Sequence, residues 1–489
     1  MDGVDVVIVG AGAAGLMTAL LTARAGHRVT VLEREPLRPA ATVEEAAGRA
    51  FRPTAPQIVQ PHVLLARYRL LLREHLPDVY AGLVGDGAVE SRLEAQLPPT
   101  LRDLAPEPAD DRYTMLLTRR STLDRVLDAR VRAEPGITLH TGATVRGLRT
   151  EGGAPPRVTG VRLGDGELAA DVVVDASGRR SRIDAWLTAT GARPRPVVVA
   201  DCGLAYYSRH YRLRGPDGLP GRADNRTILP LDEFVAGMWG ADNGTVVLGL
   251  CPLAEDHRFR VLRDPAVFTA VFDTVPGLRG WLDVLEPISD VFPMGGLHNT
   301  LHRLVDHARP VALGIHAVGD GVCTTNPTLA RGLGVALRTA LDLVEVLDAH
   351  PRDPFARALA HDAAITEGVE PFYLDQARTD AARLARVRGV LHERGVLDGP
   401  PPAPAAPPPP APSTGRVGFD ELSAAALFDA ALFRTATSVR GMLARPEEVY
   451  TDPAVVARVR AVQAAHRDGV PAPAQPDPDR LATALACGA

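Results

Sequence analysis

Residues 5–35 read DVVIVGAGAAGLMTALLTARAGHRVTVLERE, and this stretch decides the fold. The β-branched run at 5–9 predicts a buried strand, the Ala- and Leu-rich segment after the glycines predicts a helix, and RVTVLE at 28–33 predicts a second strand. This is the strand–helix–strand unit of a parallel sheet. Residues 6–23 carry no charge, as in a membrane span, but the glycines inside them argue against a span.

The three glycines are spaced as GxGxxG between the strand and the helix. Gly10 permits a tight turn, Gly12 lets the backbone approach a pyrophosphate, and Gly15 lets helix and strand pack closely. Ala13 and Ala14 begin the helix, whose free N–H groups and positive dipole favour phosphate. The motif predicts a dinucleotide site, and a glycine-rich core turn is the structural alternative.

Glu33 ends the second strand, where a carboxylate accepts hydrogen bonds from a ribose diol, and Arg34 follows it. These residues leave open whether the dinucleotide is FAD or NAD.

Composition narrows the function classes. The chain has 489 residues, enough for two or three domains, and a net charge of −5 without a basic block, which argues against a nucleic-acid partner. All 54 basic residues are Arg, so no mechanism that needs a lysine can operate. The four Cys form no CxxC, which predicts neither a disulfide framework nor a metal site and fits a reducing cytoplasm.

The pattern along the chain predicts an α/β fold with an inserted sheet. We expect a discontinuous Rossmann-type, glutathione-reductase-like domain, a mixed or antiparallel substrate domain, a Pro-rich linker and a C-terminal helical segment. The Rossmann-type domain is predicted at 1–80, 110–190 and 290–395, and the substrate domain at 81–109 and 191–289. The linker is predicted at 396–417 and the helical segment at 418–489.

Three further stretches identify the cofactor. They are TRRSTLDRVL (118–127), VVVDASGRRSR (172–182) and AVGDGVCTTNP (317–327), which RGLGVAL follows. With GxGxxG they make about residues 1–395 resemble the FAD-dependent monooxygenases of the para-hydroxybenzoate-hydroxylase fold, also called group A. The resemblance implies FAD, held at GxGxxG by its ADP half.

The resemblance also implies a set of cofactor residues. Gly319 and Asp320 would hold the ribityl chain, and Pro327, Gly332 and Leu333 would lie at a helix start that faces the flavin N1–C2=O edge. The remaining candidates are Arg120 near the phosphate and ribityl chain, Val145 at the adenine, and Arg52 and Gln57 beside the cofactor. For Arg52 and His62 the alternative is a loop-anchoring role.

Some residues depart from the group A pattern. Ser177-Gly178 replaces the usual Asp-Gly, and this substitution and CTTNPTLARG resemble the subgroup of polyether-type epoxidases and related bacterial tailoring oxygenases. Ala330 and Gly334 replace a usual Gly and Asn. The electron source stays open: NADH or NADPH directly, or a separate flavin reductase. A lysine-dependent halogenase is excluded, because the chain has neither the lysine nor a Trp-x-Trp-x-Ile-Pro motif.

The segment YYSRHYRL (206–213) is the substrate-side candidate. Strand alternation places Tyr207, Arg209 and Tyr211 on one face, and Tyr206, Ser208 and His210 on the other. In the family this sheet roofs the flavin. We therefore expect Tyr207, Arg209, Tyr211 and His62 at the substrate, with a plain amphipathic strand as the alternative.

By resemblance, the function is that of an FAD monooxygenase. A flavin C4a-hydroperoxide would epoxidise or hydroxylate a hydrophobic natural-product intermediate, as in antibiotic biosynthesis, with O₂ as co-substrate. The alternatives are a flavin-dependent reductase or dehydrogenase of the prenyl-reductase type, and a non-catalytic FAD-binding protein. No catalytic side chain stands out in the sequence.

Overall fold

The computed structural model describes residues 3–215, 226–398, 415–466 and 473–487. The Pro-rich run 399–412, predicted as a linker, lies outside these ranges. Within them, no helix combines the length and the apolar character that crossing a membrane requires.

A five-stranded parallel sheet forms the centre of the larger domain. Its strand order is β20-β10-β1-β2-β6, and each neighbouring pair is parallel. The strands are β1 (Asp5–Val9), β2 (Arg28–Glu33), β6 (Ile137–Thr141), β10 (Val172–Asp175) and β20 (Ile315–Ala317). The residues of β10 and β20 are all buried, as expected for a sheet covered on both faces.

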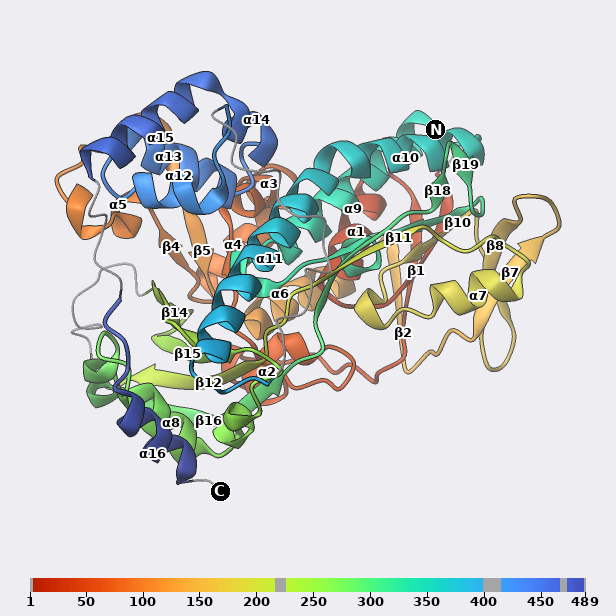
Figure 1. Cartoon of the computed structure of the whole chain (residues 1–489). Helices are drawn as coiled ribbons and strands as arrows, with labels where there is room; N and C mark the ends of the chain where they lie inside the picture. Colours follow the sequence, from red (N-terminus) through yellow and green to blue (C-terminus); the bar gives the residue numbers. More distant parts are fainter. Residues whose placement is uncertain (1–2, 216–225, 399–414, 467–472, 488–489) are drawn as a thin grey trace.

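Helices cover one face of this sheet and a small sheet covers the other. The helical face is built by α1 (Ala13–Arg24), α3 (Ala66–His75), α4 (Pro77–Gly85), α6 (Arg120–Ala133) and α9 (Gly332–Ala349), whose apolar side chains form one core. The other face packs on β7 (Gly147–Glu151), β8 (Arg157–Arg162), β9 (Glu167–Ala169) and α7 (Ile183–Ala189). The three-layer arrangement in Figure 1 confirms the predicted fold class.

A second, antiparallel sheet builds the other end of the molecule. Its order is β13-β14-β15-β12-β16. The strands are β12 (Tyr206–Leu213), β13 (Arg226–Pro230), β14 (Phe234–Gly240), β15 (Thr245–Pro252) and β16 (Leu285–Met294). One face packs on η5 (His257–Arg263), α8 (Pro265–Asp273), η6 (Arg279–Val284) and α16 (Pro478–Ala486), as Figure 1 shows at the bottom of the molecule.

Three small sheets and two long helices join the two parts. The sheets are β11 (Val197–Asp201), β17 (His298–His302) and β21 (Cys323–Thr324); β3 (Val63–Leu64), β5 (Met115–Leu117) and β4 (Val89–Ser91); and β18 (Val305–Asp306) with β19 (Arg309–Pro310). The helices are α10 (Pro354–Gly368) and α11 (Glu370–Glu393). Within the segment 81–109, which was predicted to belong to the substrate domain, β4 is hydrogen-bonded to β5 of the cofactor side.

The C-terminal helices fall into two groups. A bundle of α12 (Phe419–Ala425), α13 (Ala430–Arg440), α14 (Pro446–Thr451) and α15 (Pro453–Ala465) shares a core with the region around α5 (Leu93–Gln96), η2 (Pro99–Leu101) and η3 (Pro108–Tyr113). The last helix, α16, packs at the other end of the molecule against α8. The predicted single segment 418–489 is therefore divided, because α16 has its own apolar stripe of Leu481, Ala484 and Leu485.

Candidate functional site

The turn between β1 and α1 brings three backbone segments into close contact. Gly10 has φ +109°, and its N–H donates to the Leu32 carbonyl at 2.8 Å. A Cβ at Gly10 would lie 2.6 Å from the Ala176 carbonyl oxygen, and a Cβ at Gly15 would lie 1.9 Å from the Gly10 oxygen. At Gly12, in contrast, no atom lies within 4 Å of the Cβ position. The turn is closed behind and open in front, as the approach of a phosphate requires.

Glu33 supports this turn from the end of β2. Its carboxylate, 5% exposed, accepts hydrogen bonds at 2.9 Å from the backbone N–H groups of Ala11 and Glu35. Arg52 places Nη2 3.3 Å from this carboxylate and Nε 2.5 Å from that of Glu35. Burial lowers the pKa of Arg52 and the charge of Glu33 raises it, with a net increase, so Arg52 stays cationic.

A pocket with an empty volume of about 920 Å³ opens in front of the turn. Eight of the predicted cofactor residues line it: Gly10, Gly12, Glu33, Arg34, Arg52, Gln57, Arg120 and Val145. Ala13, Ala14 and Gly15 lie directly behind it in α1. The Oε1 atom of Gln57 is buried without a hydrogen-bond partner among the described residues, so the pocket wall presents an unsatisfied acceptor.

The lining of this pocket is strongly cationic. Beside Arg34, Arg52 and Arg120 it carries Arg179, Arg180 and Arg182, against the single carboxylate of Glu33. Guanidinium groups bind phosphate oxygens in bidentate geometry, so the pocket suits a ligand with several negative charges.

The turn after β10 contributes residues that the sequence prediction did not include. Asp175 accepts hydrogen bonds from the Ser177 backbone N–H at 3.1 Å, from the Ser177 hydroxyl, and from the Ser181 hydroxyl at 2.7 Å. Ser177 thus stabilises the turn that presents Arg179 and Arg180 to the pocket. The signal was the position of VVVDASGRRSR itself, because the carboxyl ends of neighbouring parallel strands meet at one edge of a sheet.

Gly319 and Asp320 form the 3₁₀-helix η7 (Gly319–Gly321) directly after β20. Gly319 has φ +58°, and its Cβ position lies 2.7 Å from the Cβ of Ala14. Its N–H donates to Thr339 Oγ1 in α9 at 3.0 Å. The Gly-Asp turn is therefore enclosed between the two helices that begin at this edge of the sheet.

The Asp320 carboxylate accepts no hydrogen bond from any other described residue. Burial raises its pKa, while the positive charges of Arg120 and Arg179 lower it, with a net increase. Both arginines also line the pocket, so Asp320 lies near it, although it is not part of the lining. An unsatisfied carboxylate in this position is suited to accept hydroxyl donors from a ligand.

The predicted stretch around Pro327 forms a tight loop before α9. Pro327 begins η8 (Pro327–Leu329), whose first turn is capped by the Asn326 side chain, and Ala330 has φ +56°. Gly332 and Leu333 begin α9, and no atom lies within 4 Å of the Cβ position of Gly332. The N-terminus of α9, with its positive dipole, is thus open beside Gly332.

Helix α11 holds this loop from behind through buried polar side chains. The N–H of Asn326 donates to Asn299 Oδ1 at 2.6 Å, and Asn299 Nδ2 donates to Asp380 Oδ2 at 2.8 Å. The Gln376 amide donates to Thr328 Oγ1 at 3.2 Å. The side-chain atoms Thr325 Oγ1 and Asn326 Nδ2 are buried without partners among the described residues.

A buried aspartate joins the second sheet to the helix that carries Arg120. Asp242, in the turn between β14 and β15, is 0% exposed. It accepts hydrogen bonds from the Arg119 backbone N–H at 2.6 Å and Nε at 2.8 Å, and from the hydroxyls of Thr118 at 3.0 Å and Thr122 at 2.9 Å. Burial raises the pKa of Asp242, but the hydrogen bond from Arg119 and its charge outweigh burial and lower it.

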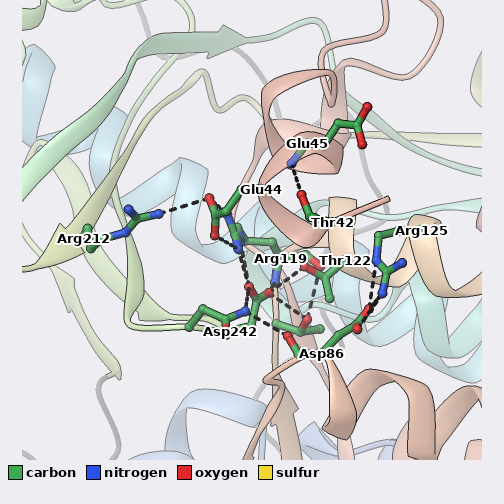
Figure 2. A network of polar contacts seen from close by, with 11 residues as sticks. Thr42, Glu44, Glu45, Asp86, Arg119, Thr122, Arg125, Arg212 and Asp242 are labelled. Carbon is green, nitrogen blue, oxygen red and sulfur yellow. Dashed lines mark hydrogen bonds and ion pairs between the residues drawn. The ribbon is translucent and has the colours of Figure 1, made fainter. Parts of the chain in front are cut away.

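The same network reaches the short helix α2 (Val43–Gly48). Figure 2 shows Glu44, in α2, between the guanidinium groups of Arg119 and Arg212, each at 3.1 Å. Beside it, Arg125 of α6 pairs with Asp86, whose backbone carbonyl accepts a hydrogen bond from Asn243. Arg119 therefore ties α2, α6 and the β14–β15 turn together next to Arg120.

The antiparallel sheet presents to the cofactor side the face opposite to the predicted one. Tyr207 and Tyr211 belong to the core with α8, and Arg209 donates to the Pro265 carbonyl and Thr269 Oγ1 of that helix. Ser208 and His210 point the other way, toward residues 59–62. Tyr207, Arg209 and Tyr211 therefore lie on the α8 side of the sheet, because alternation defines two faces but not which one α8 covers, and their substrate role stays a prediction.

Next to residues 59–62, the inner face of this sheet carries neutral and aromatic groups. Ser208 donates to Gln60 Oε1 at 2.7 Å, and Gln60 donates to the Phe292 carbonyl at 3.1 Å. The Trp239 indole lies over two glycines, since Cβ positions at Gly237 and Gly249 would come within 2.3 Å and 2.8 Å of its ring.

His62 lies between this face and the cofactor side. Its Nδ1 is 2.9 Å from the Gln60 carbonyl oxygen. Burial, and after it the charge of Arg120, lowers the pKa of His62 to about 3. Burial also lowers the pKa of His210. Both imidazoles are therefore neutral at pH 7.

The donor set of this site fits FAD. The open backbone at Gly12, the cationic pocket, the unsatisfied Gln57 oxygen and the unpaired Asp320 carboxylate match a ligand with a pyrophosphate at one end and hydroxyls further in. Among the described residues, no group of His, Cys, Asp and Glu side chains is arranged to hold a metal ion.

Comparisons with known proteins agree with this class of dinucleotide-binding protein. The family described as FAD dependent oxidoreductase matches residues 5–180. The Escherichia coli protein YdiS, named as a probable electron transfer flavoprotein-quinone oxidoreductase, is 32% identical over 355 residues, which cover 69% of this chain and 75% of YdiS. The chain therefore belongs to the FAD-dependent oxidoreductases.

Two more relatives show how widely this family diverges. Protein Rv3254 of Mycobacterium tuberculosis is 29% identical over 359 residues, covering 67% of this chain and 69% of that protein. The 6-methylpretetramide 4-monooxygenase of Streptomyces rimosus is 34% identical over 193 residues, covering 37% of this chain and 39% of that enzyme.

Solved structures share the fold at low sequence identity. The flavin-dependent brominase Bmp2 superposes with a TM-score of 0.60 at 16% identity, covering 95% of this chain and 100% of the brominase. PqsL, a probable FAD-dependent monooxygenase from Pseudomonas aeruginosa, gives a TM-score of 0.58 at 16% identity, covering 80% of this chain and 100% of PqsL. These likenesses concern the fold alone.

Proposed function

We propose that this FAD-dependent oxidoreductase is a monooxygenase that epoxidises or hydroxylates a hydrophobic natural-product intermediate in the cytoplasm. The observation that carries the proposal is the neutral inner face of the antiparallel sheet beside the cofactor site. His210, Trp239 and Phe292 offer apolar and hydrogen-bonding surface there, and His62 is a weak base. Such a site holds a substrate and leaves the reaction to the cofactor and O₂.

The proposed path of the cofactor runs from Glu33 past the α1 N-terminus to Asp320. Glu33 would accept the ribose hydroxyls, Gly12 and the α1 N-terminus would face the pyrophosphate, and Asp320 would accept a ribityl hydroxyl. The α9 N-terminus at Gly332 would lie at the flavin N1–C2=O edge and stabilise negative charge there. When bound and reduced, FAD supplies the electrons that activate O₂.

The chain's own contribution is to position the substrate and exclude water. The hydrogen bond from Ser208 to Gln60 fixes the inner face of the sheet to residues 59–62. The Asp242 network fixes the same sheet to α6. With the pKa of His62 at about 3, removal of a substrate proton by this imidazole is disfavoured at neutral pH. This favours epoxidation, or hydroxylation of a substrate that needs no ionisation.

The electron donor is proposed to be NADH or NADPH, acting directly or through a separate flavin reductase. The Ser177 hydroxyl is occupied by Asp175 within its turn, so it does not replace a free carboxylate for a nicotinamide dinucleotide. Mixing the FAD-loaded protein anaerobically with NADH, with NADPH, and with either plus a flavin reductase compares these routes by the loss of the oxidised-flavin absorbance.

The oxygenase proposal is tested with isotopically labelled O₂. The FAD-loaded protein is reduced anaerobically, mixed with a panel of hydrophobic polyketide-like aromatics and polyenes, and exposed to ¹⁸O₂. We expect one ¹⁸O atom in a product, detected by mass spectrometry. A substrate that is oxidised or reduced without incorporating ¹⁸O would contradict the proposal.

The likeness to YdiS favours one alternative, an oxidoreductase that passes electrons without oxygen transfer. The reductase or dehydrogenase of the prenyl-reductase type belongs to this class. In that case the reduced protein would transfer electrons to a quinone or an isoprenoid double bond under anaerobic conditions. The same experiment separates the two, because this turnover needs no O₂.

A further inference from the structure

The residue before α9 is an arginine with no exposure at all. Arg331 is 0% exposed, and its Nη2 lies 2.6 Å from Asp375 Oδ2 in α11. Its Nη1 donates to the Phe372 carbonyl at 3.0 Å, while its Nε makes no hydrogen bond with another described residue. Two contacts to α11 therefore hold the guanidinium, and with it the first residue before Gly332.

Asp375 is shared with a residue from the C-terminal helical bundle. Its Oδ1 accepts a hydrogen bond from the Tyr450 hydroxyl at 2.8 Å. Tyr450, in α14, is 2% exposed, and its backbone carbonyl accepts a hydrogen bond from the Val417 N–H at 3.0 Å. Burial, and after it the charge of Asp375, raises the pKa of Tyr450, so its hydroxyl stays protonated and donates.

A second contact from the bundle reaches the first turn of α9 itself. Met442 has φ +61°, is 1% exposed, and places its sulfur 2.7 Å from the Cβ position of Gly334. Its backbone carbonyl accepts a hydrogen bond from Arg67 Nη1 at 3.1 Å. An alanine at position 334 would press on Met442, so the bundle and the α9 start fit each other closely.

We propose that Tyr450 is a positioning residue for the flavin ring, acting through Asp375 and Arg331 on the first N–H groups of α9. The inference rests on the proposed placement of the ring at Gly332. Residues 415–466 then form the rear wall of the cofactor site. Loss of the Tyr450 hydrogen bond to the buried Asp375 carboxylate weakens the ion pair that fixes Arg331. The first backbone N–H groups of α9 then lose their fixed orientation toward the flavin ring.

Tyr450→Phe tests the proposal in the full-length chain, because it removes the hydroxyl and keeps the ring in its core. Tyr113→Phe is the matched control: Tyr113 is buried in the same apolar cluster, and its hydroxyl bonds to no other described residue. We expect Tyr450→Phe to weaken FAD binding by about threefold to tenfold and to shift the flavin midpoint potential and visible spectrum. Tyr113→Phe should leave all three unchanged.

A second variant shows whether Tyr450 acts through the carboxylate. In Asp375→Asn, adding Tyr450→Phe should change FAD affinity much less than it does in the natural sequence. Additive effects, or a Tyr450→Phe protein equal to the control in affinity, potential and spectrum, would overturn the proposal. Thermal unfolding without FAD shows whether either variant has lost its fold. Because no substrate or O₂ is used, failure of the monooxygenase proposal leaves this result intact.

Discussion

Asp242 and Asp320 lie at the two sides of Arg119 and Arg120, and the structure treats them in opposite ways. Asp242 is fully buried, and its carboxylate accepts five hydrogen bonds, four from Thr118, Arg119 and Thr122 and one from Asn243 Nδ2, and its pKa is lowered. The Asp320 carboxylate accepts none from the described residues, and its pKa is raised. A carboxylate with all its donors supplied by the chain joins parts of the molecule, whereas one left without donors is available to a ligand.

Among the substitutions that test this difference between the two aspartates, we expect the largest effect from Asp242, on the free energy of unfolding. Asp242→Ala should lower the free energy of unfolding by about 3 kcal/mol or more, because it removes the buried acceptor of Thr118, Arg119 and Thr122 and leaves the Arg119 guanidinium only its pair with the exposed Glu44. Urea unfolding followed by circular dichroism measures it. In the control Asp78→Ala, which breaks a partly exposed pair with Arg24, the loss should stay within about 1 kcal/mol. Equal losses of unfolding free energy in the two variants would show that Asp242 does not hold the second sheet to α6.

At Asp320 the expected effect is on cofactor binding. Asp320→Ala should weaken FAD binding by about tenfold to a hundredfold, since a hydrogen bond to a charged acceptor is lost. Stability without FAD should be unchanged or higher, because burial makes the charged form unfavourable in the folded protein. Titration calorimetry and unfolding without FAD measure both quantities. The control is Asp5→Ala at the opposite end of β1, and unchanged FAD affinity in Asp320→Ala would remove the residue from the site.

The smallest expected effect is a difference in pH dependence of about 1 kcal/mol. The lowered pKa of Asp242 gives stability above its ordinary value of 3.8, which is lost as the pH falls below that value. The raised pKa of Asp320 has the reverse sign: stability is highest below 3.8 and is lost as the pH rises through the raised pKa. Unfolding of wild type, Asp242→Asn and Asp320→Asn between about pH 3 and about pH 6 tests this, and slopes of equal sign would contradict it.

Local rules predicted the parts of the site that local backbone determines. The GxGxxG turn and Glu33 at the end of β2 follow from strand and helix periodicity and from glycine geometry, whereas the helix start at Gly332 was inferred from the family resemblance. The cofactor roles of these residues remain predictions. The position of the arginines after β10 beside the cofactor turn could also have been predicted, because the same pattern places their strand in the parallel sheet.

Contacts between distant segments were not predictable from the sequence. Which face of the antiparallel sheet is the inner one depends on where α8 packs. The contact that decides it, between Arg209 and Thr269, joins residues 60 positions apart in the sequence. The pairing of β4 with β5 and the hydrogen bond from Tyr450 to Asp375 join segments whose own patterns carry no sign of a partner. Such contacts depend on the assembled tertiary structure rather than on local propensity.

The position of Tyr450 has a consequence for biosynthesis. A ribosome releases the βαβ unit, the Gly-Asp turn and Arg331 before residues 415–466 exist. Until Tyr450 arrives, the charged pair of Arg331 and Asp375 lacks the tyrosine hydroxyl and the apolar cover that bury it in the finished protein. Residues 415–466 therefore complete, later in synthesis, the wall behind a motif that is made earlier, and a chain interrupted in the Pro-rich run would lack this cover on the pair.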